Sequence, residues 1–334
     1  MKNSKTLVPV ILLLIIAGFF CWAIYAPKED LSQRIYQTIK EQEKRADLAF
    51  NRVDFEEINA GQKYWQLSAA TAFINKDTGV ATLQKADGTF FKAGRPVLKF
   101  RSPAALWDMK KKEIFLDKPL GYDISLEKKI AALAQGNKNN HTSVFNLPQT
   151  YDHNAGYWFQ SSNLSWRLAD QLLICTGGII LTKGEVTGRA EKLLSDVGLE
   201  NIRLEGKPLL VLTTTSAPIT LEAVIFEVKS KQGLFIARGE PKTTWRDAQI
   251  FARDASYHQD DARIDFNGDV KIYYKDITAF GDAASYLTKE QKVIVTGRAN
   301  AQQGENKLSG DKLIVSLKDK KISLSGKGRV VISE

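Results

Sequence analysis

The side chains that most often carry catalysis are scarce in this chain. Its three histidines, His141, His153 and His258, have a spacing that fits no zinc-ligand pattern. The chain contains neither the Gly-x-Ser-x-Gly motif of a serine nucleophile nor the Gly-x4-Gly-Lys-Ser/Thr loop that binds nucleotide phosphates. Its two cysteines, Cys21 and Cys175, cannot support a disulfide framework. We therefore predict that the protein is not an enzyme and that it holds no cofactor and no metal.

The chemistry that remains is apolar, and it follows a strict pattern. From Phe55 onward, apolar and polar residues alternate with a period of two, most clearly between residues 262 and 274. There Ile264, Phe266 and Ile272 share one parity, and charged residues occupy the other. Because side chains alternate across a strand, each strand has one apolar face and one wetted face. The apolar faces form either a packed core or an apolar trough that is left partly open.

Regularly spaced glycines mark a repeat within this pattern. Gly268, Gly297 and Gly326 each close a short alternating run, and they lie 29 residues apart. A fixed period of this length is typical of stacked supersecondary units. By parity these glycines fall on the apolar face, where the missing side chain allows a sharp bend. Steps of 29, 33 and 29 residues backward extend the set of predicted strand bends to Gly239, Gly206 and Gly177.

The repeat predicts an all-β fold, an elongated and open-ended jelly roll built from two packed sheets, with a β-solenoid as the alternative. A polar stretch near residues 213–218 precedes a restart of the pattern, and it predicts a boundary between modules at residues 51–215 and 216–334. Residues 128–162 interrupt the repeat, which predicts a long loop with one embedded strand. Unpaired edge strands at either end favour end-to-end assembly with another chain.

A predicted membrane anchor precedes the β-structure. Residues 7–26 carry no charge, and as a helix they would span about 30 Å. Lys2 and Lys5 come before this span, so the positive-inside rule puts residues 1–6 in the cytoplasm. Residues 27–50 predict a helical stalk. A cleaved signal peptide is the alternative, but the apolar stretch exceeds a typical signal core. We predict a single-pass protein of the cell inner membrane with its C-terminal part in the periplasm.

The chain is basic, with a net charge of +9. Outside the cytoplasm nucleic acid is not an expected partner, and no basic-aromatic binding module is present. Anionic lipid headgroups or phosphorylated glycolipids would suit this charge. Scattered lysines that keep exposed sheets soluble are the alternative explanation.

Two stretches resemble known families. Residues 61–69 (GQKYWQLSA) and the turn that follows resemble the start of the periplasmic domain of the LptC family, single-span proteins of the lipopolysaccharide export bridge. Residues 293–297 (VIVTG) and 310–313 (GDKL) resemble the LptA/OstA family, the soluble middle piece of that bridge. The resemblances cover about residues 5–210 and 215–334. The chain departs from the LptC pattern because it continues into this second module, which leaves open whether it recruits or replaces a separate LptA.

The resemblance implies a membrane-anchored bridge component. Such a protein receives lipopolysaccharide from an inner-membrane ABC transporter and passes it along an apolar groove toward the outer membrane. Its partners would be lipopolysaccharide, that transporter and an LptA-like protein bound through edge strands. A structural β-solenoid scaffold of the envelope, without lipid transport, is the alternative. The predicted groove-lining residues are Phe73, Leu83, Trp107, Phe115, Trp166, Ile174, Leu204, Phe226, Ile264, Phe266, Ile272, Tyr286, Val295, Leu313 and Leu324.

Overall fold

The structure is a computed structural model, and the predicted span at residues 7–26 lies outside the part that it describes. Within the described part, no helix is long and apolar enough to cross a membrane. Gln37, Lys40 and Glu41 are helical, and the first strand begins at Leu48, just before the end of the predicted stalk. The structure describes residues 37, 40–41, 46–127, 156–214 and 217–332.

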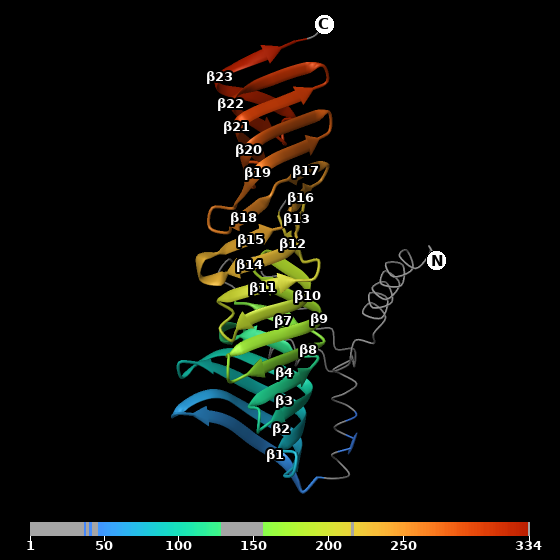
Figure 1. Cartoon of the computed structure of the whole chain (residues 1–334), viewed down its shortest axis with the longest axis vertical. Coiled ribbons are helices and arrows are strands. Elements are labelled where there is room, and N and C mark those ends of the chain that lie inside the picture. The colour runs from blue at the N-terminus through green and yellow to red at the C-terminus, as the bar shows by residue number, and fades with distance from the viewer. Residues whose placement is uncertain (1–36, 38–39, 42–45, 128–155, 215–216, 333–334) are drawn as a thin grey trace, which may run out of the picture.

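The described strands are antiparallel to their neighbours and form one continuous 23-stranded sheet. They stack along the long axis of the molecule, with β1 at one end and β23 at the other (Figure 1). The all-β prediction is confirmed, and this architecture is consistent with a jelly roll. The first strands are β1 (Leu48–Asn59), β2 (Gln62–Asn75), β3 (Val80–Lys92), β4 (Arg95–Asp108), β5 (Glu113–Asp117) and β6 (Leu120–Asp123), followed by the 3-10 helix η1 (Ile124–Leu126).

The remaining strands follow the predicted polar loop, of which residues 128–155 lie outside the described ranges. They are β7 (Trp158–Gln160), β8 (Asn163–Arg167), β9 (Leu172–Lys183), β10 (Val186–Asp196), β11 (Asn201–Glu205), β12 (Leu209–Leu212), β13 (Ile219–Glu222), β14 (Ile225–Lys229), β15 (Leu234–Arg238), β16 (Lys242–Trp245), β17 (Ala248–Phe251), β18 (Asp254–His258), β19 (Arg263–Tyr274), β20 (Ile277–Leu287), β21 (Lys292–Gln303), β22 (Asn306–Ser316) and β23 (Lys321–Val331), with the 3-10 helix η2 (Ser230–Gln232) between β14 and β15.

Two kinds of turn alternate along the stack, and they explain the 29-residue period. Two-residue turns and four-residue turns connect the long strands alternately, as at residues 275–276 and 288–291 on either side of β20. Two strands and one turn of each kind make up one period. We call the row of four-residue turns rim A, and it comprises residues 76–79, 109–112, 168–171, 197–200, 230–233, 259–262, 288–291 and 317–320. The two-residue turns form rim B, which comprises residues 60–61, 93–94, 184–185, 246–247, 275–276 and 304–305.

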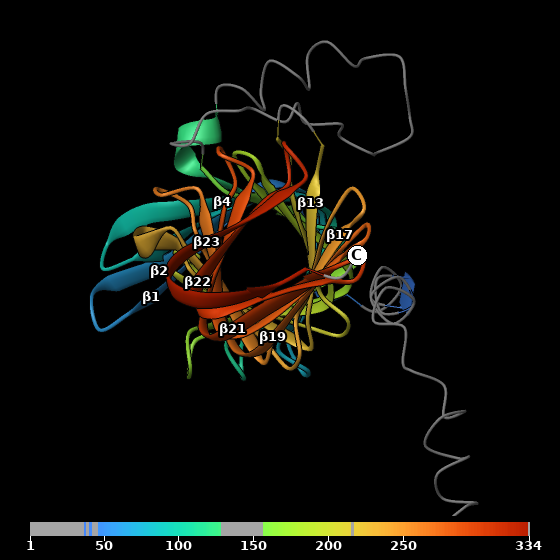
Figure 2. The ribbon, with the colours of Figure 1, turned by 90° about the horizontal axis from the view of Figure 1, so that it is seen from above.

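Most strands bend near the middle, so that one half of each strand runs to rim A and the other half to rim B. β11 and β12 show the bend as a break, because both pair with β10 on either side of Gly206. β19 shows it as a bulge, where its register with β20 shifts between Asn267 and Val270. Seen along the long axis, the strands therefore wrap around a common interior (Figure 2).

The predicted glycines lie at these bends, and all six have positive φ, from 69° at Gly297 to 92° at Gly326. Each lies against the residue 15 positions earlier in the chain. A Cβ on Gly297 would be 2.7 Å from Cβ of Asp282, and one on Gly268 would be 2.9 Å from Cβ of Arg253. Arg253 is an exposed side chain, so the glycines do not occupy the apolar face that strand parity predicted. The bulge turns the backbone at these positions, and simple alternation fails there.

The strand pairing runs without a break through the predicted module boundary at residues 215–216. β11 pairs with β14, and β12 pairs with β13. One apolar cluster extends from Trp65 in β2 to Leu317 beyond β22. The division into two modules stays a prediction, and these pairings join both of its sides.

Candidate functional site

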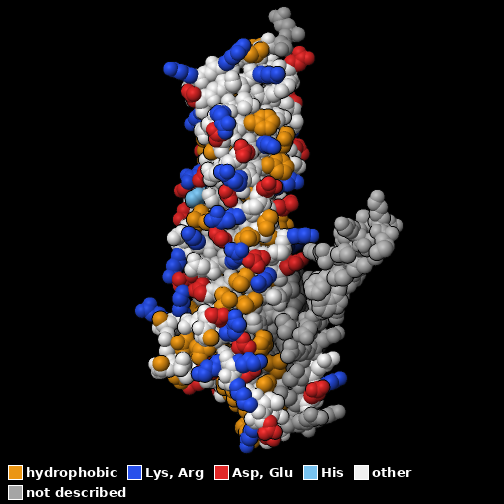
Figure 3. Space-filling view, viewed as in Figure 1, with side chains coloured by type: hydrophobic (Ala, Val, Ile, Leu, Met, Phe, Trp, Pro, Cys, Tyr) orange, Lys and Arg blue, Asp and Glu red, His pale blue; other side chains and the backbone are white. Residues whose placement is uncertain are grey.

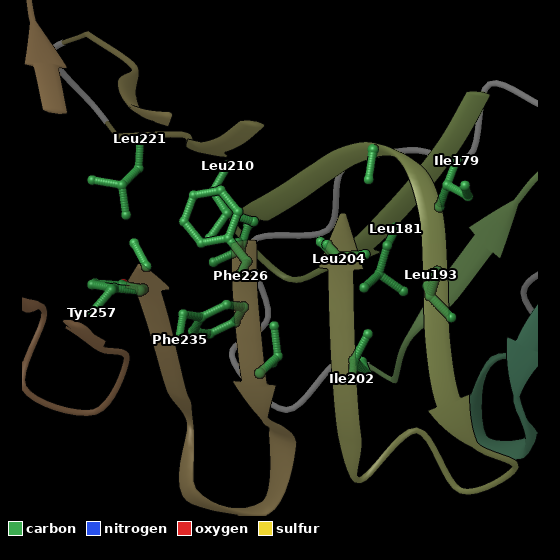
Figure 4. Close-up of a cluster of buried hydrophobic side chains, with 14 of the residues drawn as sticks. Ile179, Leu181, Leu193, Ile202, Leu204, Leu210, Leu221, Phe226, Phe235 and Tyr257 are labelled. Carbon is green, nitrogen blue, oxygen red and sulfur yellow. The ribbon is translucent and has the colours of Figure 1, made fainter. Parts of the chain in front are cut away.

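The interior of the wrapped sheet is the candidate site, and it is largely apolar, with Thr243, opposite Leu221, and Ser195, opposite Ile202, as buried polar exceptions. Figure 4 shows its middle part, where Leu193 and Leu204 face the same space as Phe226 and Phe235. These side chains are almost completely buried, with exposed fractions of 0% for Phe226 and 2% for Phe235. In this described part, the interior is therefore filled by the protein's own side chains, which leave no open trough in this conformation.

Most of the predicted groove-lining residues lie in this interior. Trp107 and Leu324 are partly buried and pack against the core. The fully buried ones are Leu83, Trp166, Leu204, Phe226, Ile264, Phe266, Ile272, Tyr286, Val295 and Leu313. Whether any of them binds lipid stays a prediction, because each is equally a core residue.

Phe73, Phe115 and Ile174 do not face the interior. Phe115 packs against Ala104 and Leu106 in a separate small cluster on the other face of the sheet. Phe115 and Ile174 each stand in an unbroken apolar run, in which parity cannot be assigned from the sequence. Phe73 is displaced for another reason.

The inward-facing positions of β2 shift by one residue at its bend. Ala69 and Ala72 both belong to the core, although they are three residues apart. Phe73, next to Ala72, therefore faces outward and pairs with Thr82 of β3. No glycine stands at this bend, so the sequence did not indicate it.

The sequence-based set missed several large interior residues. Among them, Trp65, Phe90, Phe100 and Phe159 are all at most 1% exposed. For Phe100 a signal was present, because Leu98 and Phe100 alternate with Lys99 and Arg101. For Phe90 the following Phe91 obscured the parity.

The two rims meet along one line, which we call the seam, and side-chain contacts hold it. Lys92, beside rim B, places its Nζ 2.6 Å from Oδ2 of Asp196 and 3.0 Å from Oε1 of Glu200, both at rim A. Further along, Lys183 Nζ donates to the carbonyl of Ser230 at 3.3 Å. In the C-terminal part, the Tyr274 hydroxyl donates to the carbonyl of Leu317 at 2.9 Å.

Charge and burial shift the pKa values of the ionisable groups at the seam. Burial lowers the pKa of Lys92, but its hydrogen bonds to Asp196 and Glu200 outweigh this and raise it. Burial raises the pKa of Asp196, and its hydrogen bonds with Lys92 and with the backbone N–H groups of Asn201 and Glu200 outweigh that and lower it. Burial lowers the pKa of Lys183, which lies 4.9 Å from the ring centre of Tyr157. The N-terminal seam is thus held by ion pairs.

Aromatic pairs lie beneath the seam, each joining a side chain near rim A to one near rim B. Trp107 meets Trp65 with ring centres 5.1 Å apart, and Trp166 meets Tyr64 at 6.2 Å. In the C-terminal part Tyr286 meets Trp245 at 6.5 Å.

The rim-A members of these pairs share an unusual property. Nε1 of Trp107, Nε1 of Trp166 and Oη of Tyr286 are buried, and none has a hydrogen-bond partner within the described part of the chain. A buried donor left unpaired costs about 1–3 kcal/mol. These three groups are therefore unsatisfied in the closed seam.

The outer surface is mixed in charge. Lysine and arginine alternate with acidic residues over the face in Figure 3, with single apolar residues between them. Among the described residues, no group of His, Cys, Asp or Glu could hold a metal ion.

The two ends of the stack expose strand edges. In the described strands β1 pairs with β2 and β23 pairs with β22, and each has its other edge free. Apolar side chains lie at both ends: Phe50 and Ile58 on β1, and Val330, Val331 and Ile332 at the C-terminal end. Such edges are sites where another strand can add.

Comparison with known proteins finds one family model that matches part of the chain. Residues 160–321 match the family model described as "LptA/(LptD N-terminal domain) LPS transport protein". This part of the chain is similar to that family, and the match begins well before the boundary predicted at residue 216. The match does not extend to residues 51–159, so the LptC-like part stays a prediction.

One similar solved structure is LptH from Pseudomonas aeruginosa, described as the LptA homologous periplasmic component of the conserved lipopolysaccharide transport device. The two chains are 19% identical, with a TM-score of 0.33, and the alignment covers 35% of this chain and 96% of LptH. No protein with a curated description matches the chain in sequence.

Proposed function

We propose that this protein is a periplasmic component of lipopolysaccharide transport that carries acyl chains in the interior of its sheet. The observation that carries the proposal is the match of residues 160–321 to a transport family, over strands whose inner face is predominantly apolar. Burying a CH₂ group gains about 0.8 kcal/mol, so moving an acyl chain of about 14 carbons out of water gains about 10 kcal/mol. An apolar interior that runs along the whole stack offers such shelter.

Photo-crosslinking in cells tests this function. A photoreactive residue at Phe266 or Ile272, both 0% exposed, should capture lipopolysaccharide. Lys271 is the matched control, because it stands beside Ile272 on the same strand but faces outward. Capture from Lys271 and not from the two interior positions would reject the proposal.

We further propose that residues 7–26 anchor the protein in the inner membrane, where it receives lipopolysaccharide from an ABC transporter. The uncharged span and the lysines before it support this orientation. The full chain should remain with the membrane after carbonate extraction, and a chain lacking residues 1–30 should be released. Release of the full chain would overturn the anchor and leave the lipid proposal standing.

The free edges support assembly into a bridge with an LptA-like protein. Lysine on an edge strand opposes pairing. Val330→Lys, at a position 53% exposed on β23, should therefore weaken that contact. Tyr273→Lys is the control, because Tyr273 is exposed on the outer face of β19, away from both ends.

A structural scaffold is the second candidate, and the closed interior favours it. Side chains such as Ile264 and Val295 leave no exposed surface for a ligand in this conformation. A scaffold would give no lipid capture at any of the positions above.

A further inference from the structure

A hollow of about 730 Å³ lies on the outer surface of the N-terminal strands, where they bend. Its lining comes from β3, β4, β6, β7 and β9 and from the links that follow β5 and β7. Neighbouring strands lie about 4.8 Å apart, so the four spacings from β3 to β9 give it a length of about 19 Å. Its volume is typical of a site for a small molecule. We call it the bend hollow, and its lining includes Lys85, Arg101, Pro103, Lys118, Leu120 and Ile180.

The sheet itself separates the bend hollow from the apolar interior. β3 pairs with β4 on both sides of Lys85, through Gln84 with Ala104 and through Ala86 with Ser102. The bends lie near the middle of the strands, whereas the seam lies where the ends of the strands meet. A ligand in the bend hollow is therefore a different molecule from a lipid held in the interior.

Two lysines approach the bend hollow from opposite sides of β4. Lys85 lies opposite Pro103 of β4, because the residues on either side of each pair with one another. Lys118 directly follows Asp117, which pairs with Ala104 from the other side of β4. Two strand spacings, about 10 Å, thus separate the backbones of the two lysines. Their flexible four-carbon stems allow both ammonium groups to reach one anion above Pro103.

The positive charge of these lysines is not neutralised within the described part of the chain. Lys85 and Lys118 are exposed, and neither has an ion pair or a side-chain hydrogen bond there. Arg101 is different, because its Nε donates to Oδ2 of Asp87 at 2.8 Å. Asp87 is the one carboxylate among the described residues of the lining. Two cations are therefore free to bind an anion.

A hollow at the C-terminal bends has no such excess of charge. It has a volume of about 560 Å³, and its lining balances Arg253 and Lys271 with Glu240 and Asp269. The excess of positive charge is therefore a property of the N-terminal bends and does not follow from bending the sheet. A concave surface lined by charges of one sign concentrates ligands of the opposite sign.

We propose that the bend hollow binds a small organic anion whose carboxylate or phosphate group lies between Lys85 and Lys118. Its apolar part covers Pro103, Leu120 and Ile180, which line the same hollow. The two ammonium groups supply charge-assisted hydrogen bonds, and the apolar lining favours an anion with a hydrocarbon part over an inorganic one. This site does not depend on the proposed transport of lipid.

Calorimetric titration of the full chain in phosphatidylcholine nanodiscs tests the site, with empty nanodiscs as the background. The probes are hexanoate, hexyl phosphate and the neutral 1-hexanol. At least one of the two anions should bind, and hexanol should bind at least about tenfold more weakly. Raising the salt to 0.5 M should weaken the binding of the anion. Binding of neither anion, or equal binding of hexanol, would overturn the proposal.

Lys85→Asn and Lys118→Asn locate the anion. Asparagine is used because it tolerates the left-handed conformation of the two lysines, whose φ values are 51° and 45°. Each variant should weaken binding about tenfold. Lys207→Asn is the matched control, because Lys207 has a φ of 54° at another bend and does not line the hollow. Equal losses in all three variants, with the fold intact by urea denaturation, would overturn the site.

Nanodiscs that contain phosphatidylglycerol distinguish two sources of the anion. If the natural ligand is a lipid phosphate, these nanodiscs should compete with the soluble probe and weaken its binding through Lys85 and Lys118. Unchanged binding of the probe would identify a soluble anion instead. Both results support the site, whereas competition that persists in Lys85→Asn and Lys118→Asn would place the lipid elsewhere and overturn it as a headgroup site.

Discussion

The bends of the N-terminal strands and those of the C-terminal strands have similar backbone conformations but are made by different residues. In the C-terminal part, glycines with φ between 69° and 92° occupy them, in the order that the sequence analysis found. In the N-terminal part, Arg52, Lys85 and Lys118 have φ values of 52°, 51° and 45°. These basic residues are 33 apart, compared with 29 for most of the glycines, because the N-terminal strands are longer.

The comparison shows that this fold makes the same bend in two ways, with a glycine before the left-handed residue or without one. A residue with a Cβ in the left-handed region costs about 1–2 kcal/mol relative to its ordinary conformation, and glycine avoids this cost. Lys85 and Lys118 both line a hollow on the outer surface of the bends, together with Arg101. The N-terminal bends are therefore basic. Both sets of bends hold a non-glycine residue in the left-handed region, since Asp269 and Arg298 follow Gly268 and Gly297 with φ values of 48° and 46°.

Gly297→Val should lower stability the most, because it disrupts a bend of the C-terminal part. The new Cβ would lie 2.7 Å from Cβ of Asp282, and a β-branched residue strongly disfavours a φ of 69°. We expect the free energy of unfolding to fall by about 3 kcal/mol or more. Urea denaturation of the purified protein measures it. Gly304→Val is the control for a glycine in a turn with open space around it. It should cost less, and an equal loss in both would show that steric contact at the bend is unimportant.

Lys85→Gly, at a bend of the N-terminal part, should change stability in the opposite direction. It relieves the left-handed strain at φ 51° but increases the entropy of the unfolded chain. The expected net result is a gain of up to about 1 kcal/mol in the free energy of unfolding. Lys85→Ala removes the charge and keeps the Cβ, so it should leave stability unchanged. If both variants stabilise the protein equally, charge repulsion rather than backbone strain limits the N-terminal bends.

The same comparison explains how much of the molecule could be predicted from its sequence. The alternation between residues 262 and 274 and the glycine period carried the strands and bends of the C-terminal part, because both signals come from local backbone rules. The N-terminal bends were missed, since lysine is not a residue that marks a left-handed conformation. One missed bend lies in β2, opposite Lys85 of β3, and because of it Phe73 was predicted on the wrong face. The seam could not be predicted, because its contacts join residues as far apart as Lys92 and Asp196.

The seam itself differs between the two parts, and its contacts provide the smallest predicted effect. Asp196→Asn removes the charge that faces Lys92 but keeps an oxygen for the backbone N–H groups of Glu200 and Asn201. At pH 7 the variant should be less stable by less than about 1 kcal/mol, because the pair is partly exposed. The folded-state pKa of Asp196 lies below its ordinary value of 3.8, so its contribution is fully present above that pH. It should disappear as the pH falls further, through the folded-state pKa.

Tyr274→Phe is the corresponding change at the C-terminal seam, where a hydroxyl donates to the carbonyl of Leu317. Its loss should cost about 1 kcal/mol. Because no ion pair is involved, 0.5 M salt should leave this cost unchanged, whereas the same salt should reduce the effect of Asp196→Asn. Denaturation of both variants and the parent at low and high salt makes the measurement. Equal salt dependence in the two variants would mean that the two ends of the seam are held by the same kind of contact, and the contrast between an ionic and a neutral closure would be lost.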